Sequence, residues 1–148
     1  MRISVKGRYA LAAVTVIAQK AQSLENVTVS RISEELGLSK IYLEQVFSQL
    51  KREGLLLSVK GPRGGYRLTR SPSKITAWDV LTALESGLTE KTESTVEDSA
   101  PEIETALRVI VFDPLDDMLR ARLSEITLRD ILDFSDEQKT QQSFMLNL

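Results

Sequence analysis

Two short amphipathic segments separated by only three residues set the strongest constraint on how this chain can fold. Thr28 is placed to cap a helix over VSRISEEL, and Gly37 follows as a helix stop. After the connection GLS, Ser39 is placed to cap a second helix over KIYLEQVFSQLKRE. The expected inner face of that helix consists of Leu43, Val46, Phe47 and Leu50. This spacing is typical of a helix-turn-helix, although other helical hairpins share it.

A glycine-rich stretch, VKGPRGGYRL at residues 59–68, follows the second helix and lies between two apolar, strand-like runs. It predicts a β-hairpin in which Gly64 and Gly65 allow a tight reversal and Tyr66 faces the core. A phosphate cradle is the weaker alternative, because the stretch matches neither GxxxxGK[ST] nor GxGxxG and no helix begins directly after it. A purely structural turn remains a second alternative. The order helix, turn, helix, hairpin indicates a winged helix.

The other helices are predicted from their caps and periodicity. Ser4 can cap a helix over residues 4–22. Thr76 with Asp79, and later Thr127 with Asp130, form two copies of a capping-box variant at helix starts. We therefore expect a mainly α protein with a small β-hairpin wing and a long C-terminal dimerisation helix.

The C-terminal half has a different organisation. Residues 87–102 are acidic and nearly free of large apolar groups, which predicts a flexible loop, whereas residues 103–124 carry a long apolar stripe. Pro114 interrupts that stripe and either restarts the helix or kinks it. An apolar face this long cannot be buried by one N-terminal core, so a homodimer is expected. The predicted dimer contacts are Leu107, Ile110, Val111, Leu115, Met118, Leu119 and Leu123.

Four regions follow: a winged helix-turn-helix domain over 1–86, the acidic loop over 87–102, a dimerisation region over 103–134, and a tail over 135–148 that is expected to be poorly ordered in part. No apolar run approaches the length of a membrane span, and the polar, basic N-terminus does not have the pattern of a secretory signal. A cytoplasmic location is therefore expected.

The chain contains no cysteine and no histidine. This excludes disulfides, thiolate metal sites, cysteine nucleophiles and histidine-based acid–base catalysis. A carboxylate or lysine enzyme remains conceivable, but no nucleophile–base pair can be placed. We expect a protein that is not an enzyme and that carries no metal and no cofactor.

Charge is divided unevenly along the chain. Residues 1–70 hold 12 Lys and Arg against 5 Asp and Glu, whereas residues 71–148 hold 7 against 16. A basic first half suggests a surface for a polyanion, and random placement of surface charge is the alternative. Cations cluster at the first helix (Arg2, Lys6, Arg8), at the end of the second short helix (Lys51, Arg52) and beside the hairpin tip (Lys60, Arg63).

The outer face of the second short helix carries side chains suited to base edges in a major groove. Gln45 can pair with an adenine, Glu44 can accept from a cytosine amine, Ile41 can contact a thymine methyl group, and Lys40 can reach a guanine or a phosphate. The alternative is a solvated helix face without a partner. The nearby cations favour DNA, because phosphate contacts supply most of the salt-sensitive affinity.

Four segments in order and spacing resemble the Rrf2 (Rrf-two) family of bacterial winged-helix transcription regulators. They are KGRYAL (6–11), ISEELGLSKIYLEQVFSQLKREGLL (32–56), VKGPRGGYRL (59–68) and ITAWDVLTALE (75–85). The resemblance covers residues 1–86 closely and extends more loosely to about residue 132 through ITLRDIL. The combination of YLEQ, GGY and IT..DV is specific, although no single piece would be.

The resemblance implies a homodimer that places two recognition helices in successive major grooves of a palindromic operator and usually represses transcription. It places the YLEQ segment and its neighbours at base edges, the wing near a minor groove, and the KGRY segment near phosphates. The complete predicted DNA-binding set is Arg2, Lys6, Tyr9, Thr28, Ser39, Lys40, Ile41, Tyr42, Glu44, Gln45, Ser48, Gln49, Arg52, Lys60, Gly61, Pro62, Arg63 and Gly64.

One departure from the family pattern concerns the sensor. Cluster-binding members carry three cysteines in the segment that corresponds to residues 87–108, and this chain has none. An iron–sulfur cluster with the usual ligands is therefore excluded, and the chain is most similar to the cysteine-free, CymR-type members, some of which are controlled by a protein partner. The predicted function is a homodimeric DNA-binding regulator, most simply a repressor. The alternative is a winged-helix protein-interaction module without sequence-specific DNA binding.

Overall fold

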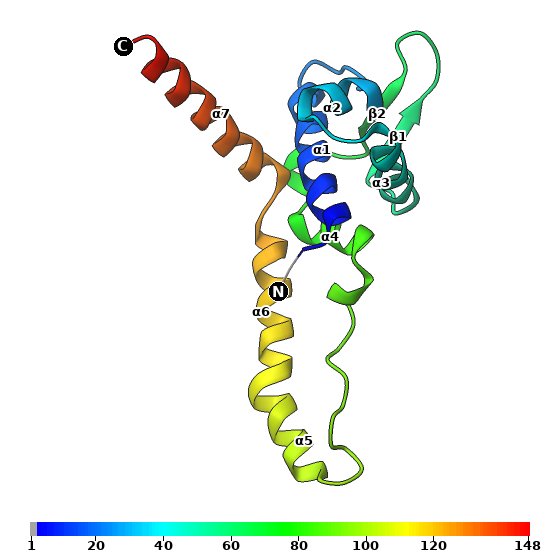
Figure 1. The fold of residues 1–148 in the computed structure, drawn as a ribbon, viewed down its shortest axis with the longest axis vertical. Coiled ribbons are helices and arrows are strands. Elements are labelled where there is room, and N and C mark those ends of the chain that lie inside the picture. The colour runs from blue at the N-terminus through cyan, green and yellow to red at the C-terminus, as the bar shows by residue number, and fades with distance from the viewer. Residues whose placement is uncertain (1–2) are drawn as a thin grey trace.

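The computed structural model describes residues 3–148 (Figure 1). Helices α1 (Val5–Ala21), α2 (Val29–Leu36) and α3 (Lys40–Arg52) precede the hairpin strands β1 (Leu56–Val59) and β2 (Gly65–Leu68). A 3-10 turn, η1 (Pro72–Lys74), leads to α4 (Ala77–Leu84) and to a second turn, η2 (Ser86–Leu88). The C-terminal part contains α5 (Pro101–Leu107), a π-helical segment η3 (Arg108–Phe112), α6 (Asp113–Glu125) and α7 (Leu128–Leu146). This order confirms the mainly helical winged-helix class expected from the sequence.

The predicted helix caps are present in the N-terminal unit. The Ser4 hydroxyl accepts from the Gly7 N–H at 3.0 Å, and the Thr28 hydroxyl accepts from the Arg31 N–H at 3.2 Å. Gly37 ends α2 with a φ of 65°, a left-handed conformation that glycine adopts at little cost. These local signals therefore begin and end the helices at the residues that the sequence indicated.

The core of this unit lies between α1, α3, α4 and the inner face of the hairpin. Phe47 is fully buried at its centre, and its ring meets the edge of Tyr66 from β2 with centroids 4.9 Å apart. The predicted inner face of α3 is confirmed, because Leu43, Val46 and Leu50 are also 0% exposed. Burying each such side chain contributes about 1.5–3 kcal/mol, so this face fixes how α3 is rotated.

Helices α4 and α7 begin side by side at a short backbone bridge. The Ala77 N–H donates to the Ile126 carbonyl at 2.8 Å, and the Leu128 N–H donates to the Ile75 carbonyl at 2.9 Å. The two predicted capping boxes stand directly at this bridge, which pairs Thr76 with Thr127. Through this bridge the chain packs on the winged-helix unit again after helices α5 and α6, which extend away from it.

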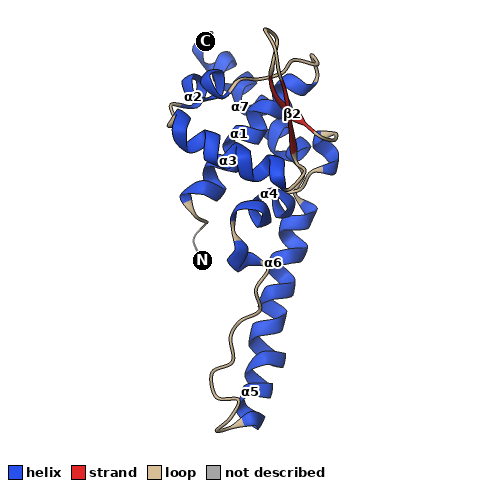
Figure 2. Cartoon of the chain, turned by 90° about the vertical axis from the view of Figure 1, so that its right-hand side faces the viewer, coloured by secondary structure: helices blue, strands red, loops and turns tan. Residues whose placement is uncertain are grey.

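Beyond that unit, α5, η3 and α6 form one continuous rod, and residues 89–100 run alongside it (Figures 1 and 2). Of the two alternatives for Pro114, the structure is nearer to the restart, because α6 begins at Asp113 with Pro114 in its first turn, although no gap separates it from the helical segment before it. The helical path continues through Pro114, and a π turn lies immediately before it, with the Asp113 N–H bonded to the Arg108 carbonyl.

The tail over 135–148, expected to be poorly ordered in part, is helical in the structure as far as Leu146, and its degree of order stays a prediction. Helix α7 continues to Leu146 and extends away from the body (Figure 1). The segment contains no glycine or proline, and its Glu, Gln and Lys residues favour helix even without tertiary contacts. Only the first turns of α7 are anchored, because Leu128 and Leu132 are buried whereas residues 136–148 are exposed.

Candidate nucleic-acid interface

The outer face of α3 is exposed over its whole length. The Ser39 hydroxyl caps the helix by accepting from the Tyr42 N–H at 3.3 Å. Ile41 is 72% exposed despite being a large apolar residue, and nothing in the described chain covers it. The other exposed members of this face are Lys40, Glu44, Gln45, Ser48 and Arg52. This face is a ridge of mixed donors, acceptors and one apolar group, which is the composition that base edges require.

Two members of the predicted α3 set are not fully on this face. Gln49 is half-buried, and its Oε1 is buried without a hydrogen-bond partner among the described residues. Tyr42 is also half-buried, because its ring meets the Tyr9 ring of α1 edge-on with centroids 5.2 Å apart. The expectation that Tyr42 points away from the apolar side therefore needs correction, since helical spacing alone could not show that α1 supplies a ring beside it.

The pair of tyrosines also places the start of α1 beside the start of α3. Lys6 lies one helical turn before Tyr9 and is half-exposed. Arg2, the other predicted contact of this region, lies outside the described residues. Lys6 and the α3 face thus belong to neighbouring parts of one surface.

The wing is an antiparallel hairpin with residues 60–64 as its loop. Its register pairs Leu56 with Leu68 and Val59 with Gly65. Lys60, Gly61, Pro62 and Arg63 are all exposed at the tip, and Gly64 is half-buried. Gly61 has a φ of 107° with open space around its α-carbon, so its requirement for glycine is conformational.

The loop between α1 and α2 holds the wing in place. The Val27 N–H donates to the Tyr66 carbonyl at 2.9 Å, and the Tyr66 N–H donates to the Val27 carbonyl at 2.8 Å. Asn26 Nδ2 donates to the Arg63 carbonyl at 3.0 Å. Gly65 has a φ of 143°, and a Cβ there would lie 2.7 Å from the Val27 carbonyl group. The sequence did not indicate this anchor, because it joins segments almost 40 residues apart.

Some cations of the chain form ion pairs with its own carboxylates and others do not. Lys20, Arg31 and Arg70, which lie away from the α3 face and the wing tip, all form ion pairs with carboxylates. Within residues 3–148, none of the predicted DNA-contacting cations forms an ion pair. Those cations are Lys6, Lys40, Arg52, Lys60 and Arg63. Their charge is therefore free to meet an external polyanion.

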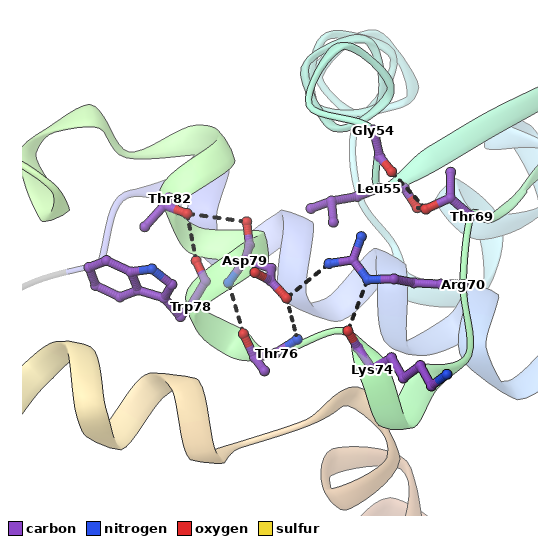
Figure 3. A network of polar contacts seen from close by, with 9 residues as sticks. All are labelled: Gly54, Leu55, Thr69, Arg70, Lys74, Thr76, Trp78, Asp79 and Thr82. Carbon is purple, nitrogen blue, oxygen red and sulfur yellow. Dashed lines mark hydrogen bonds and ion pairs between the residues drawn. The ribbon is translucent and has the colours of Figure 1, made fainter.

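Behind the wing, a polar network fixes the exit of β2 against α4 (Figure 3). Thr69 Oγ1 donates to the Gly54 carbonyl at 2.7 Å. Arg70 donates through Nε to the Lys74 carbonyl at 2.9 Å and through Nη2 to Asp79 Oδ2 at 3.1 Å. The same Asp79 oxygen accepts from the Thr76 N–H at 2.9 Å, so one carboxylate serves both the helix cap and the wing.

Thr28 and Ser39 of the predicted set, and the nearby Lys51 outside it, have structural partners of their own. Thr28 and Ser39 use their hydroxyl oxygens as caps of α2 and α3, while each residue stays exposed. Lys51, at the end of α3, donates to Ser58 Oγ of the wing at 2.8 Å. The Thr28 and Ser39 hydroxyls each keep a proton that can be donated outward, so the same hydroxyl can cap its helix and contact a phosphate.

The acidic loop is held by one buried acid that sequence reasoning did not single out. Glu104 of α5 is 5% exposed, and its Oε2 accepts from the N–H groups of Val96 and Thr95 at 2.9 Å each. Arg108 lies 3.5 Å from Glu104 Oε1 and donates to the Thr92 carbonyl at 2.9 Å. The hydrogen bonds from Val96 and Thr95, in that order, lower the pKa of Glu104 below its ordinary 4.5, with burial opposing them and Arg108 adding to them.

The predicted dimer contacts divide between two faces of the rod. Ile110, Val111, Leu115 and Met118 are 73%, 40%, 57% and 66% exposed. Leu107, Leu119 and Leu123 are half-buried against their own chain. Helix α6 packs on α4, and Arg120 of α6 lies over the Trp78 ring of α4, 5.8 Å from its centroid.

Comparison with known proteins shows that the chain is similar to transcriptional regulators. The family model Rrf2, described as an iron-dependent transcriptional regulator, matches residues 3–133. The HTH-type transcriptional regulator IscR of Cronobacter sakazakii is 34% identical over 147 residues, which cover 95% of this chain and 90% of that protein.

Two solved structures have the same fold over most of the chain. CymR, the global cysteine regulator of B. subtilis, aligns with a TM-score of 0.73 at 30% identity, over 90% of this chain and 98% of its own. IscR of T. potens aligns with a TM-score of 0.71 at 32% identity, over 93% and 90%. No helix within residues 3–148 is both long and apolar enough to cross a membrane.

The iron dependence in the family description can be tested against the donor groups of this chain. Thiolate and imidazole ligands are impossible, since the sequence has no cysteine and no histidine. In the region of the loop, the buried carboxylate of Glu104 already binds two backbone N–H groups beside a guanidinium. Across residues 3–148, no group of three or more acidic side chains is close enough to hold a metal ion. The residues do not fit an iron–sulfur cluster.

Proposed function

Because this chain belongs to the Rrf2 family of DNA-binding transcriptional regulators, which is not an enzyme family, we propose that it is a homodimeric repressor that recognises a palindromic operator. We further propose that it acts in the cytoplasm and without an iron–sulfur cluster. The observation that carries the proposal is the exposed outer face of α3, flanked on both sides by cations without ion-pair partners.

Base recognition is assigned to α3. A helix of this width fits the major groove of B-DNA, where its N-terminal side chains reach base edges. Gln45 can donate to and accept from an adenine, Glu44 can accept from a cytosine amine, and the exposed Ile41 can cover a thymine methyl group. The buried inner face of α3 supports this assignment, because it leaves only one rotation of the helix available.

Phosphate binding is assigned to the cations on either side of α3. Lys6 and the capping hydroxyls of Thr28 and Ser39 serve one side, and Lys60 and Arg63 at the wing tip serve the other. These contacts carry little sequence information but fix the protein on the duplex and make binding sensitive to salt. The anchoring of the wing by Asn26 and Val27 supports this role, since a held tip loses little conformational entropy on binding.

Two copies are required for a palindromic site. The exposed apolar residues on the rod support a homodimer, because a lone chain would leave Ile110, Leu115 and Met118 in water. A twofold dimer matches the twofold symmetry of a palindrome, and each subunit then reads one half-site. Repression follows when such an operator overlaps a promoter that the bound dimer blocks.

Fluorescence anisotropy with labelled duplexes from the region upstream of the protein's own gene tests the proposal. We expect tight, steeply salt-dependent binding to a palindromic site and a stoichiometry of two chains per duplex. Gln45→Ala is expected to lose about 1–3 kcal/mol of discrimination at one base pair per half-site. Glu34→Ala, an exposed change on α2, is the matched control. Binding no tighter than to random DNA in the same salt would contradict the proposal and favour the protein-interaction alternative.

A further inference from the structure

The π turn in the rod determines which apolar residues share a face. In helices α5 and α6 and the turn between them, the large apolar side chains with more than half of their surface exposed are Ile103 (52%), Ile110 (73%), Leu115 (57%) and Met118 (66%), together with Val109 (60%), which lies about 120° around the axis from Ile103. The spacing of the first four is seven, five and three residues. Steps of seven and three keep residues on one face of an α-helix, whereas a step of five does not.

The register can be followed at about 100° per residue. In an uninterrupted α-helix, Leu115 would lie about 120° and Met118 about 60° around the axis from Ile103, and Ile110 about 20° to the other side. A π turn places one additional residue in a single turn, which rotates everything after it back by about 100°. Leu115 and Met118 then lie within about 40° of Ile103, so these two residues form one narrow stripe with Ile103 and Ile110, and Val109 lies outside it.

The inner face of the rod shows the same shift independently. Before the turn, the side chains that are buried or half-buried against the chain include Glu104 and Leu107. After it they include Asp116, Leu119 and Leu123. Without the π turn, this second group would be rotated by about 100° away from the first and would no longer face the winged-helix unit and its loop.

Pro114 gives the sequence a reason to form the turn at this place. A proline in a regular helix lacks one hydrogen-bond donor, and its ring clashes with the carbonyl four residues before it, here that of Ile110. The Asp113 N–H instead bonds to the Arg108 carbonyl, five residues back, which widens the helix immediately before the proline.

We propose that this π turn sets the pairing register of the homodimer by aligning Ile103, Ile110, Leu115 and Met118 into the seam that meets a second copy of the chain. The inference rests on the proposed homodimer and adds which residues lie in the seam. A stripe of this width matches the contact line of two packed helices.

Charge along the rod favours an antiparallel partner. Residues 101–118 hold five acids and one arginine, whereas residues 119–125 hold two arginines and one acid. An antiparallel, twofold pair places the basic end of each rod beside the acidic part of its mate, whereas a parallel pair places like charges together. The ends of two antiparallel rods are thus complementary in charge, and their apolar stripes face each other.

A label scan tests the register without altering the backbone. Because the chain has no cysteine, single cysteines can carry a nitroxide whose mobility is read by electron paramagnetic resonance. Leu115→Cys and Met118→Cys lie in the shifted register, whereas Asp117→Cys and Ala121→Cys occupy the stripe of an uninterrupted helix, and all four positions are exposed. Each labelled chain is mixed with an excess of unlabelled chain. We expect labels 115 and 118 to become immobile and labels 117 and 121 to stay mobile.

Deletion of Val109 provides a second test. Removing one residue from η3 converts the π turn into a regular helix, so the two halves of the stripe separate by about 100°. Sedimentation velocity is expected to show a dimer dissociation constant at least about tenfold higher than in the wild type. Val109→Ala removes most of the same exposed side chain but keeps the residue count, and it should dimerise like the wild type.

The outcomes separate this inference from the proposed function. A wild-type chain that remains monomeric at micromolar concentration overturns the dimer and the seam together. A wild-type dimer in which labels 117 and 121 are immobilised, or in which the deletion variant pairs normally, overturns the register alone. Should the deletion variant lose its helical circular dichroism, the label scan on the full-length chain decides the question.

Discussion

The ring of Tyr9 meets the ring of Tyr42 edge-on, with centroids 5.2 Å apart and planes at 77°. This contact joins α1 to the beginning of α3, so a residue that is proposed to contact DNA also holds the fold together. The contact assigns a packing role to the Tyr42 ring and leaves the hydroxyl as the candidate for a DNA contact. The sequence alone could not distinguish these two roles.

Substitution of Tyr42 is therefore expected to act in two separable ways. Tyr42→Ala removes the ring and should lower the free energy of unfolding by about 1–3 kcal/mol, whereas Tyr42→Phe keeps the ring and should change it by less than about 0.5 kcal/mol. Urea unfolding measures this difference, and DNA titration of Tyr42→Phe then isolates the hydroxyl. A Tyr42→Ala variant as stable as the wild type would contradict the packing role.

Removing the positive charges from the wing tip should weaken binding to all DNA sequences by about the same factor. Lys60 and Arg63 form no ion pair within the described chain, so Lys60→Ala with Arg63→Ala should leave the unfolding free energy nearly unchanged. The slope of log affinity against log salt should become shallower by about one to two. Anisotropy titrations over a salt series measure this slope, and an unchanged slope would show that the wing does not touch phosphate.

The two strained glycines of the wing should differ in cost. Gly65→Ala places a Cβ 2.7 Å from the Val27 backbone in addition to its positive φ, whereas Gly61→Ala has only the φ of 107° to accommodate. We expect Gly61→Ala to cost about 1 kcal/mol and Gly65→Ala to cost about 2 kcal/mol or more. Urea unfolding of both variants gives the comparison, and equal costs would mean that Val27 moves freely away from the wing.

Loss of the cap at the α4–α7 bridge should destabilise the protein measurably. Thr76→Ala removes the hydroxyl that accepts from the Asp79 N–H at 3.1 Å and should cost about 1 kcal/mol. Thr76→Ser retains that hydroxyl and should behave like the wild type to within about 0.5 kcal/mol. Chemical denaturation measures both variants, and a serine variant as unstable as the alanine variant would assign the effect to the lost methyl group.

The Glu104 clasp predicts a pH-dependent difference between two variants. Because the folded pKa of Glu104 lies below 4.5, its contribution to stability is present above that pH and is lost as pH falls through the folded pKa. Glu104→Gln should therefore melt below the wild type at neutral pH, and the two melting temperatures should converge only below pH 4.5. Glu102→Gln, on an exposed residue of the same helix, is the control, and a difference that does not shrink in acid would contradict the charge-based role.

Much of the fold follows from local sequence signals. Ser4, Thr28, Ser39, Thr76 and Thr127 each cap the helix that the sequence indicated, and the inner face of α3 is buried as its spacing predicts. Such signals act within one helical turn and need no distant partner, which is why they are readable. The tail over 135–148 is helical as far as Leu146 although little packs against it, because its residues favour helix by themselves.

The candidate site was predictable as a set of residue types and only partly as an arrangement. The outward residues of α3 and the exposed wing tip follow from periodicity and from the glycine-rich turn. The half-burial of Tyr42, the anchoring of the wing by Asn26 and the clasp of Glu104 on the acidic loop each depend on a partner from another element. No local pattern marks such partners.

The sequence by itself determined the helix boundaries of the winged-helix unit, the hairpin, the division of charge and the absence of cysteine and histidine ligands, because each depends on composition or on neighbours within a few residues. The tertiary structure alone decided which cations remain without an ion-pair partner and how the apolar residues of the rod line up. These properties depend on side chains that approach from distant segments, and on a single π turn whose rotation changes the face of every residue after it.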